Sequence, residues 1–390
     1  MKEIKIFTFT FFLLFFCVNT AFAQTYSDWW FTLEQGKQMF RQGDYGHALL
    51  TFEDARRQRR TMYDRMERNL IDLLSVTEVR RMGDSLDWVE RFIEERRYAA
   101  AADALEELYY RVPKDSLQNS ASAALSALGA LKDYPEAEYW IGEVYLTEGE
   151  SGLALDQFQK ALSMRPLLEN PGFTAELMYK IAGIYRVRRE YNEMERTLLS
   201  ILSADTLWVS GGNGTDPAEG QQQPDAVARR VSFARQAMNR TLENDGINRF
   251  ITMYRYANAE CEKAHRLLGF FYYDTGRHSR AQDHLMFSFL IQNTRIIDEV
   301  IQRRYDFTFT GLESLAVEFS RNQLILDYIE KNEYYKTAYY LATSLYGNGK
   351  TTTARNIWNF LSGQNRAGEW QTRAASQLRS SSVEPALEMP

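Results

Sequence analysis

Two groups of residues in the sequence have types that could bind phosphate or a metal. Residues 347–352, Gly-Asn-Gly-Lys-Thr-Thr, look like the end of a phosphate-binding loop. Such a loop needs an earlier glycine, where Ser344 stands, and it follows a strand, whereas a helical pattern precedes this one. His265, His278 and His284 lack an i, i+4 pair and a nearby carboxylate that would complete a metal site. The sequence therefore predicts neither a nucleotide, a metal nor another cofactor.

The other polar residues do not form an acid–base pair or an activated nucleophile. Adjacent carboxylates such as Glu94 and Glu95 point to different helix faces, because only residues three or four apart are neighbours on a helix. No serine or cysteine lies in a nucleophile-elbow motif. The basic run at 56–60 is flanked by acidic residues, which favours a solvated helix face; a patch for anionic lipid or a protein partner is the alternative. We expect that the chain is not an enzyme.

The composition limits the class of protein. The 390-residue chain is 45% hydrophobic and 25% charged, which is typical of a globular protein and not of a multispanning membrane protein. Its formal net charge of −6 disfavours nucleic-acid binding, which depends on cationic side chains facing phosphate. Two cysteines cannot build a multi-disulfide framework.

Residues 1–23 have the pattern of a signal peptide. They open with two lysines, continue with an apolar run of about a dozen residues, and end in a small-x-small site at Ala23. A helix that spans a bilayer needs roughly 20 apolar residues, so a retained anchor is the less favoured alternative. A lipoprotein acylated at Cys17 is another, although the bulky residue before that cysteine is unusual. We expect cleavage near Ala23, export to the periplasm or the outer envelope surface, and Cys261 as the one remaining cysteine.

Small residues recur at fixed spacing in the remaining chain. Within residues 36–55 and again within 139–166, a glycine is followed after seven residues by glycine, then after five by alanine, four by phenylalanine and three by alanine. Continuing this register predicts units at 29–62, 82–115, 135–168, 175–208, 262–295 and 335–368. Counted from the first residue of each unit, the eighth residue is glycine or alanine in every unit except the one that has Val89. The twentieth residue is alanine in every unit except the one that has Met194.

This pattern resembles the tetratricopeptide repeat (TPR), a helix–turn–helix unit of about 34 residues. The resemblance implies that two helices pack closely at the small residues, and that stacked units form a right-handed superhelical solenoid with a concave groove. Helical spacing between the units predicts inserted helices near 62–73, 115–131 and 227–242, the last ending at Gly246. It also predicts helices at 310–331 and 368–379. No alternating strand pattern is found, so the predicted fold class is all-α.

Composition predicts the boundaries of the helical arrays. The stretch 203–224 is rich in glycine, proline and glutamine, which predicts a flexible loop. It separates an N-terminal array at 24–202 from a C-terminal array at 225–380. Residues 381–390 are predicted to be a disordered tail.

The resemblance also indicates which residues face a partner. In TPR arrays the first helix of each unit lines the concave groove, and the residues here at these positions include Glu136, Tyr139, Glu143, Glu176, Tyr179, Arg186, Arg266, Tyr273 and Tyr339. Tyrosine suits partner binding because it offers a large, rigid contact area. The alternative is that these tyrosines complete the packing between helices. The Asn and Lys residues that grip a peptide carboxylate in some family members are absent.

The sequence therefore predicts a non-catalytic protein–protein interaction scaffold of the bacterial cell envelope, which binds segments of protein partners in the groove of a TPR superhelix. It predicts no nucleic-acid partner, and contact with a membrane only peripherally or through a partner. The alternative is a periplasmic ligand-binding accessory protein of a transport system, in which the groove and the loop near 205–224 enclose a small solute.

Overall fold

The computed structural model of the chain describes residues 29–74, 91–92, 95, 129, 131–170, 172–203, 226–319 and 321–385. Every regular element in these ranges is an α-helix or a short 3-10 helix, which confirms the predicted all-α class. The signal-like residues 1–23, most of the predicted unit at 82–115 and nearly all of the predicted loop at 203–224 lie outside the described residues.

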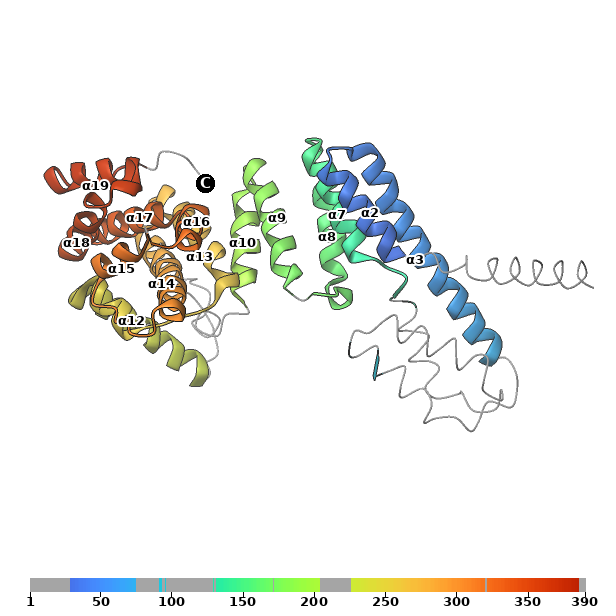
Figure 1. The fold of residues 1–390 in the computed structure, drawn as a ribbon, viewed down its shortest axis with the longest axis horizontal. Coiled ribbons are helices and arrows are strands. Elements are labelled where there is room, and N and C mark those ends of the chain that lie inside the picture. Colours follow the sequence, from blue (N-terminus) through green and yellow to red (C-terminus); the bar gives the residue numbers. More distant parts are fainter. Residues whose placement is uncertain are drawn as a thin grey trace, which may run out of the picture. The chain divides into compact units, whose positions relative to one another are not determined.

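The chain forms two compact units, Met1–Ile181 and Ala182–Pro390, and the boundary falls within helix α9. The described elements of the first unit, drawn in blue to green in Figure 1, are α2 (Trp29–Arg41), α3 (Tyr45–Leu74), α7 (Pro135–Thr147), α8 (Ser151–Ser163), the 3-10 helix η1 (Arg165–Leu167) and the first part of α9 (Phe173–Val187). Within this unit α2 packs on α3, α7 on α8 and α3 on α7. The inserted helix predicted near 62–73 is present as the second half of α3, which continues without a break to Leu74.

The second unit carries the longer series of helices. Its described elements after α9 are α10 (Tyr191–Leu202), α12 (Ala226–Met253), α13 (Ala259–Asp274), α14 (His278–Arg303), α15 (Leu312–Phe319), α16 (Gln323–Lys331), α17 (Tyr334–Gly347), α18 (Thr351–Ser362), η2 (Asn365–Ala367) and α19 (Glu369–Arg379). Helix α13 packs on α14, α14 on α17, α17 on α18 and α18 on α19. Three helices of this series, α13, α17 and α19, supply the residues of the site described below.

The helix predicted at 227–242 ends at Gly246, as expected: the range of α12 joins two helices across a kink at Gly246, whose φ of 82° is not helical, and the second of them continues to Met253. The single helix predicted at 310–331 is divided into α15 and α16. The break occurs at Asn322, whose side chain caps α16 by accepting the backbone N–H of Leu324 at 3.0 Å.

The same turn joins the two helices of each described hairpin. Between α7 and α8, Gly149 adopts a φ of 86°, and the N–H of Glu150 donates to the C=O of Tyr145 at 2.8 Å, as in a Schellman helix end. The equivalent bonds in the other hairpins run from Asp44 to Met39, from Glu190 to Tyr185, from Arg277 to Tyr272 and from Lys350 to Leu345. Residues 347–352 thus span the end of α17, the turn at 348–350 and the start of α18, whereas a phosphate-binding loop follows a strand.

The small residues at the eighth and twentieth positions lie where the two helices of a hairpin touch. A Cβ atom added to Gly142 would lie 2.7 Å from the ring of Phe158, and one added to Gly269 would lie 2.5 Å from Leu285. The twentieth-position alanines Ala48, Ala154 and Ala281 are fully buried. The predicted close approach of paired helices at these positions is therefore confirmed.

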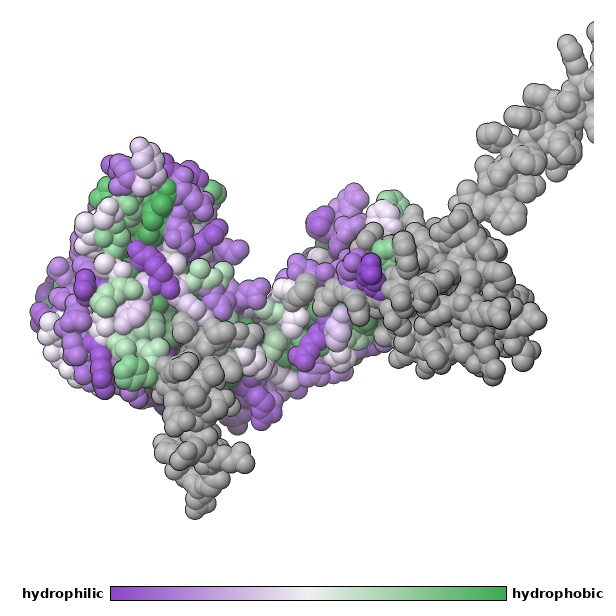
Figure 2. Space-filling model, turned by 90° about the horizontal axis from the view of Figure 1, so that it is seen from below, coloured by the Kyte–Doolittle hydropathy of each residue, from purple (hydrophilic) through white to green (hydrophobic). Residues whose placement is uncertain are grey.

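The surface of the described residues is mixed. On the face that Figure 2 shows, hydrophobic residues lie in small patches between hydrophilic ones. Scattered large apolar side chains such as Tyr305 and Phe233 are exposed among the described residues. Among the described residues, none of the helices combines the length and apolar character that a membrane span requires.

The left-handed turn position yields a pair of opposite predictions. Arg189 occupies in the α9–α10 turn the position that Gly149 has between α7 and α8, with a φ of 60°. We expect Arg189→Gly to raise the free energy of unfolding by about 1 kcal/mol, because a side chain is disfavoured in this conformation. Gly149→Ala should lower it by a similar amount. Urea unfolding of the two variants measures both changes, and equal signs would contradict the shared turn.

Candidate partner-binding site

In the first unit, the predicted groove positions of α7 and α9 are bonded to each other. The hydroxyl of Tyr139 donates to Glu176 at 2.8 Å, and its ring centroid lies 4.4 Å from that of Phe173. Tyr139 is only 3% exposed, and burial raises the pKa of its hydroxyl well above the usual value. Lys180 pairs with Glu143 at 2.7 Å. These side chains hold α7 against α9 and leave almost none of the Tyr139 surface open to a partner.

The other predicted groove residues on α7 and α9 differ in burial and in hydrogen bonding. Glu136 accepts the backbone N–H of Glu169 at 2.9 Å, and burial raises the pKa of the Glu136 carboxyl. Tyr179 is half-buried, and Arg186 is exposed. The first unit thus uses much of its predicted ladder of rings and carboxylates for internal cross-links.

In the second unit, Arg266 belongs to a buried ionic network. It is 6% exposed, lies 3.1 Å from Glu262 on its own helix, and pairs with Glu333 at the start of α17. Burial opposes ionisation of Glu333, but the charges of Arg266 and Lys336 hold its pKa below the usual value. Glu262 also accepts hydrogen bonds from Ser288 and Gln292. Arg266 therefore fixes the start of α17 against α13.

Three tyrosines of the second unit direct their hydroxyls at residues 381–385, which we call the tail segment. Tyr273 of α13 donates to the backbone carbonyl of Glu384, and Tyr346 of α17 donates to that of Ser381 at 3.2 Å. Tyr339 of α17 donates to the Glu384 carboxylate at 2.8 Å. Two of the residues chosen from the sequence, Tyr273 and Tyr339, thus bind a stretch of polypeptide that belongs to the chain itself.

The predicted disordered tail over 381–390 needs correction for residues 381–385. The prediction rested on the general tendency of chain termini to fray, but hydrogen bonds from α13, α17 and α19 hold these residues. Residues 386–390 lie outside the described residues.

Helix α19 supplies the other contacts to the tail segment. Arg373 Nη2 lies 2.7 Å from Glu384 Oε2, and Gln377 Oε1 accepts the N–H of Ser382 at 2.8 Å. Burial opposes ionisation of Glu384, but the hydrogen bonds from Arg373 and Tyr339 hold its pKa below the usual value. The segment is therefore bound mainly through its own Glu384 carboxylate and its own backbone groups. Arg355 also donates to the Ser381 hydroxyl at 3.2 Å. We call the residues that bind the backbone of the segment or Glu384 the tail-binding cluster: Tyr273, Tyr339, Tyr346, Arg373 and Gln377.

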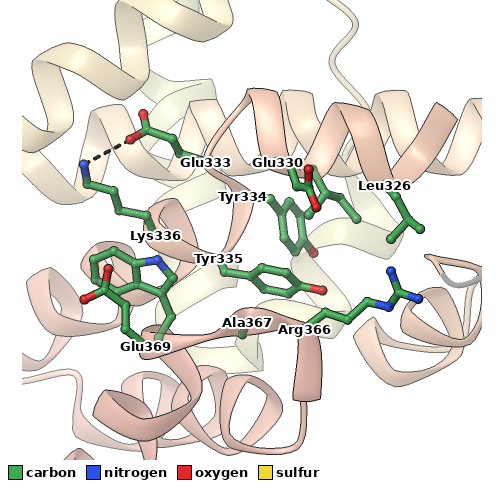
Figure 3. Close-up of a pocket in the computed structure, with 11 residues that line it drawn as sticks. Leu326, Glu330, Glu333, Tyr334, Tyr335, Lys336, Arg366, Ala367 and Glu369 are labelled. Atoms are coloured by element: carbon green, nitrogen blue, oxygen red, sulfur yellow. Dashed lines mark hydrogen bonds and ion pairs between the residues drawn. The ribbon is translucent and has the colours of Figure 1, made fainter. Parts of the chain in front are cut away.

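A pocket of about 480 Å³ opens beside this cluster, between α16, α17 and the start of α19 (Figure 3). Tyr335 and Arg366 lie side by side on one part of its wall, and Lys336 pairs with Glu333 at 3.0 Å on another. Burial raises the pKa of Tyr335 to about 12, against the opposing charge of Arg366. Trp370 lines the pocket and also packs against Tyr339, with ring centroids 5.4 Å apart. Trp370 therefore connects the pocket to Tyr339 of the tail-binding cluster, and we call this cavity the Trp370 pocket.

Asp274 introduces a pH dependence beside the cluster. It follows Tyr273 directly, and both of its carboxylate oxygens are buried without a hydrogen-bond partner. Burial raises its pKa from 3.8 to about 6, although the charge of Lys336 opposes the change. Because the folded pKa lies above the unfolded one, the folded chain binds more protons between about pH 4 and pH 6. The stability that this group contributes is therefore lost as the pH rises through that window.

We expect Asp274→Asn to raise the melting temperature at pH 7.5 by roughly 2–4 °C, the shift that about 1 kcal/mol gives in a domain of this size once solvent screening at this partly buried residue is allowed for. Near pH 4 the two proteins should melt alike, because the native carboxyl is then neutral. Melting followed by circular dichroism at both pH values checks this. A variant that melts below the wild type at pH 7.5 would mean that the ionised carboxylate is satisfied.

The histidines of the α13–α14 hairpin form a packed pair. His265 Nδ1 and His284 Nδ1 lie 3.1 Å apart, and the ring of His265 stacks on Phe287 at 5.1 Å. Burial lowers the pKa of His284 well below the usual value, so this ring is neutral at physiological pH. Within the described part of the chain, no group of three histidine, cysteine or acidic side chains is placed to hold a metal ion. Cys261 is buried and forms no disulfide.

The basic run at 56–60 is only partly solvated. Arg56 donates to the buried Glu138 of α7 at 3.1 Å. Arg59 is 1% exposed and donates to the backbone carbonyl of Leu131 at 2.8 Å. Arg57, by contrast, keeps 71% of its side chain exposed. The sequence expectation of a solvated face therefore fits Arg57 but differs for Arg59, which packs against the start of α7.

The binding of the tail segment by α19 was not predicted from the sequence. Arg373 and Gln377 lie four residues apart in the predicted helix at 368–379, and this spacing places them on one helix face. The spacing alone identifies the pair. What the pair contacts depends on the fold.

Within its described residues, the chain is an all-helical protein of recurring helical hairpins with the tail-binding cluster on its second unit. No model of a known protein family matches the sequence. Over 356 residues the chain is 25% identical to a protein of Treponema pallidum (strain Nichols) that is described only as uncharacterized, and the match covers 90% of each chain. The similarity thus extends over nearly the full length of both proteins and brings no function with it.

Proposed function

We propose that this chain is a TPR-type helical repeat protein that binds an extended segment of a protein partner on the inner face of its helix array. The described hairpins support the repeat assignment, because they share one turn geometry with a left-handed residue at the same position. Small residues meet bulky ones at the same offset, as Gly142 meets Phe158 and Gly269 meets Leu285. A repeated surface of this kind suits extended ligands.

The observation that carries the proposal is the tail segment. Tyr273 and Tyr339, chosen from the sequence as partner-facing positions, hold a stretch of polypeptide through its backbone and through one carboxylate. Binding of an extended segment by backbone hydrogen bonds with few side-chain contacts is a general mode of peptide recognition. A segment of another protein can use the same donors.

The remaining parts of the proposal rest on the sequence. The signal-like residues 1–23 favour export, with cleavage near Ala23, and hence a scaffold of the bacterial cell envelope. We propose a non-catalytic role in which any contact with the membrane is peripheral or made through the partner. The partner is a protein of the same compartment.

Site-specific photo-crosslinking in intact bacteria that produce the full chain tests this function. A photoreactive residue replaces Glu369, which is exposed and lines the Trp370 pocket, or in the control Tyr305, which is 93% exposed on the same unit but outside the site. We expect a discrete crosslinked protein from position 369 and none from position 305. Mass spectrometry identifies it. Identical products from both positions, or none from position 369, would contradict the proposal.

The alternative of a solute-binding accessory protein finds support in one observation, the Trp370 pocket. Its volume of about 480 Å³ lies in the range of roughly 300–1,000 Å³ that is usual for small-molecule sites, and it combines Tyr335 and Trp370 with the cation Arg366. Native mass spectrometry of the purified full chain, with Tyr335→Ala for comparison, tests this second candidate. A small molecule that is retained by the wild type and lost in the variant would favour it over the scaffold.

A further inference from the structure

The contacts of the tail segment define the chemistry of a segment that could replace it. Tyr273 and Tyr346 donate to its backbone carbonyls, and Gln377 accepts a backbone N–H. Every polypeptide presents these groups, so the contacts hold a segment without reading its sequence. Two side chains of the segment are also bonded: the Glu384 carboxylate by Arg373 and Tyr339, and the Ser381 hydroxyl, a small neutral group, by Arg355 and the Gln377 carbonyl. The cluster therefore selects a carboxylate on an otherwise unspecified segment.

Arg373 is a preformed receptor for that carboxylate. Its guanidinium lies 4.8 Å from the ring centroid of Tyr339 and 5.1 Å from that of Trp370, so two aromatic faces fix its position. Nη2 bonds to Glu384, whereas Nη1 is buried without a hydrogen-bond partner. A carboxylate that met both nitrogens would form a second charge-assisted hydrogen bond that the tail segment does not make.

The tail segment buries little of its own surface. Ser382, Val383 and Pro385 are exposed, and the Glu384 side chain keeps 31% of its surface in solvent. Its attachment thus depends on polar contacts, each of which contributes little net stability in water. What keeps it in place is the covalent tether, because it follows the end of α19 almost directly and its effective concentration at the site is high.

From these observations we infer that residues 381–385 are a tethered, displaceable occupant of the tail-binding cluster, and that the partner is an extended protein segment carrying an acidic side chain that competes with Glu384. The inference rests on the proposed function and names the partner class and the regulation of the same site. A competing segment also gains the Trp370 pocket, which the tail segment does not line. Because the tail segment competes for the site, only a partner segment with sufficiently high affinity displaces it.

Competition with a labelled peptide tests the inference. The probe is a fluorescein-labelled peptide with the sequence of residues 380–386, and fluorescence anisotropy measures its binding to the full chain and to a chain that ends at Ser380. We expect the shortened chain to bind at least about tenfold more tightly, because the tethered competitor is gone. In the full chain, Glu384→Lys should have the same effect, since a lysine is repelled by Arg373 while the backbone stays intact.

Variants of the receptor check which contacts are read. In the shortened chain, Arg373→Ala should weaken peptide binding at least about tenfold, because it removes the charge-assisted bond to the carboxylate. Arg303→Ala removes the same charge from an arginine that is 52% exposed on α14 and should leave binding unchanged. A peptide with glutamine in place of Glu384 should bind the shortened chain as weakly as the normal peptide binds the Arg373 variant.

Several results would overturn the inference. Equal peptide binding by the full chain, the shortened chain and the Glu384→Lys variant would show that the segment does not compete. If the shortened chain and the Glu384→Lys variant both lost peptide binding and melted at a much lower temperature, the tail segment would be a part of the fold that stability requires. Concentration-dependent dimers in light scattering that vanish on shortening would place the segment on a second copy. Peptide competition without a crosslinked cellular partner would contradict only the proposed function, and a crosslinked partner without competition would contradict only this inference.

Discussion

Gly142→Val is expected to lower the free energy of unfolding of the first unit by about 3 kcal/mol, an effect at the upper end of those from overpacking a core. A Cβ atom at this position would lie 2.7 Å from the ring of Phe158, which is fully buried and has no room to withdraw. Either the ring leaves its rotamer or α7 moves away from α8. Urea unfolding followed by circular dichroism at 222 nm measures the change.

The matched control is Gly152→Val. Gly152 lies on α8 of the same hairpin, but a Cβ atom there meets nothing within 4 Å. Valine is slightly preferred over glycine inside a helix, so this variant should unfold within about 0.5 kcal/mol of the wild type. Equal losses in the two variants would mean that the close approach of α7 and α8 does not determine the stability of the hairpin.

Much of the helical pairing could be predicted from the sequence, because it depends on local spacing. A small residue at the eighth position of a unit, with an alanine twelve residues later, identifies where two helices touch, and Ala48 and Ala154 are fully buried as expected. The turn residues follow from the same register. Local spacing did not predict that the helix expected at 310–331 is divided into α15 and α16, because the break depends on the side-chain cap that Asn322 forms.

The candidate site could be predicted only in part, because spacing identifies a helix face but not what covers it. Tyr139, Arg266 and Tyr339 occupy the same position of their units. In the structure Tyr139 donates to Glu176 of α9, Arg266 pairs with Glu333, and Tyr339 donates to Glu384. The three outcomes differ because different segments, up to 67 residues away in sequence, pack against each position.

The order of the tail segment could not be predicted from its own residues. A run such as Ser381-Ser382-Val383 has no pattern that predicts burial or regular structure, and it has none in the structure. Its order comes from donors and acceptors on three helices. Because a tyrosine hydroxyl that faces a backbone carbonyl does not depend on the sequence of that backbone, the same donors remain available to a different segment.

The two units therefore satisfy their predicted partner-facing residues in different ways. In the first unit Tyr139 is bonded to Glu176 within the packed helices, and releasing it would break helix packing. In the second unit Tyr273 and Tyr339 are bonded to the tail segment, whose release leaves α13 and α17 in contact with their other neighbours. This difference favours the second unit as the place where a partner binds.

Tyr139→Ala is the sharpest measure of that difference. We expect it to lower the free energy of unfolding by about 4 kcal/mol, the usual cost of truncating a buried aromatic side chain. Tyr139→Phe keeps the ring and loses only the hydrogen bond to Glu176, so it should cost about 1 kcal/mol. Leu153→Ala, at a side chain that is 48% exposed on α8, serves as the control and should change stability by less than about 0.5 kcal/mol. If Tyr139→Ala instead left urea unfolding unchanged and abolished the crosslinked partner, the first unit would be the binding surface and the packing role of Tyr139 would be wrong.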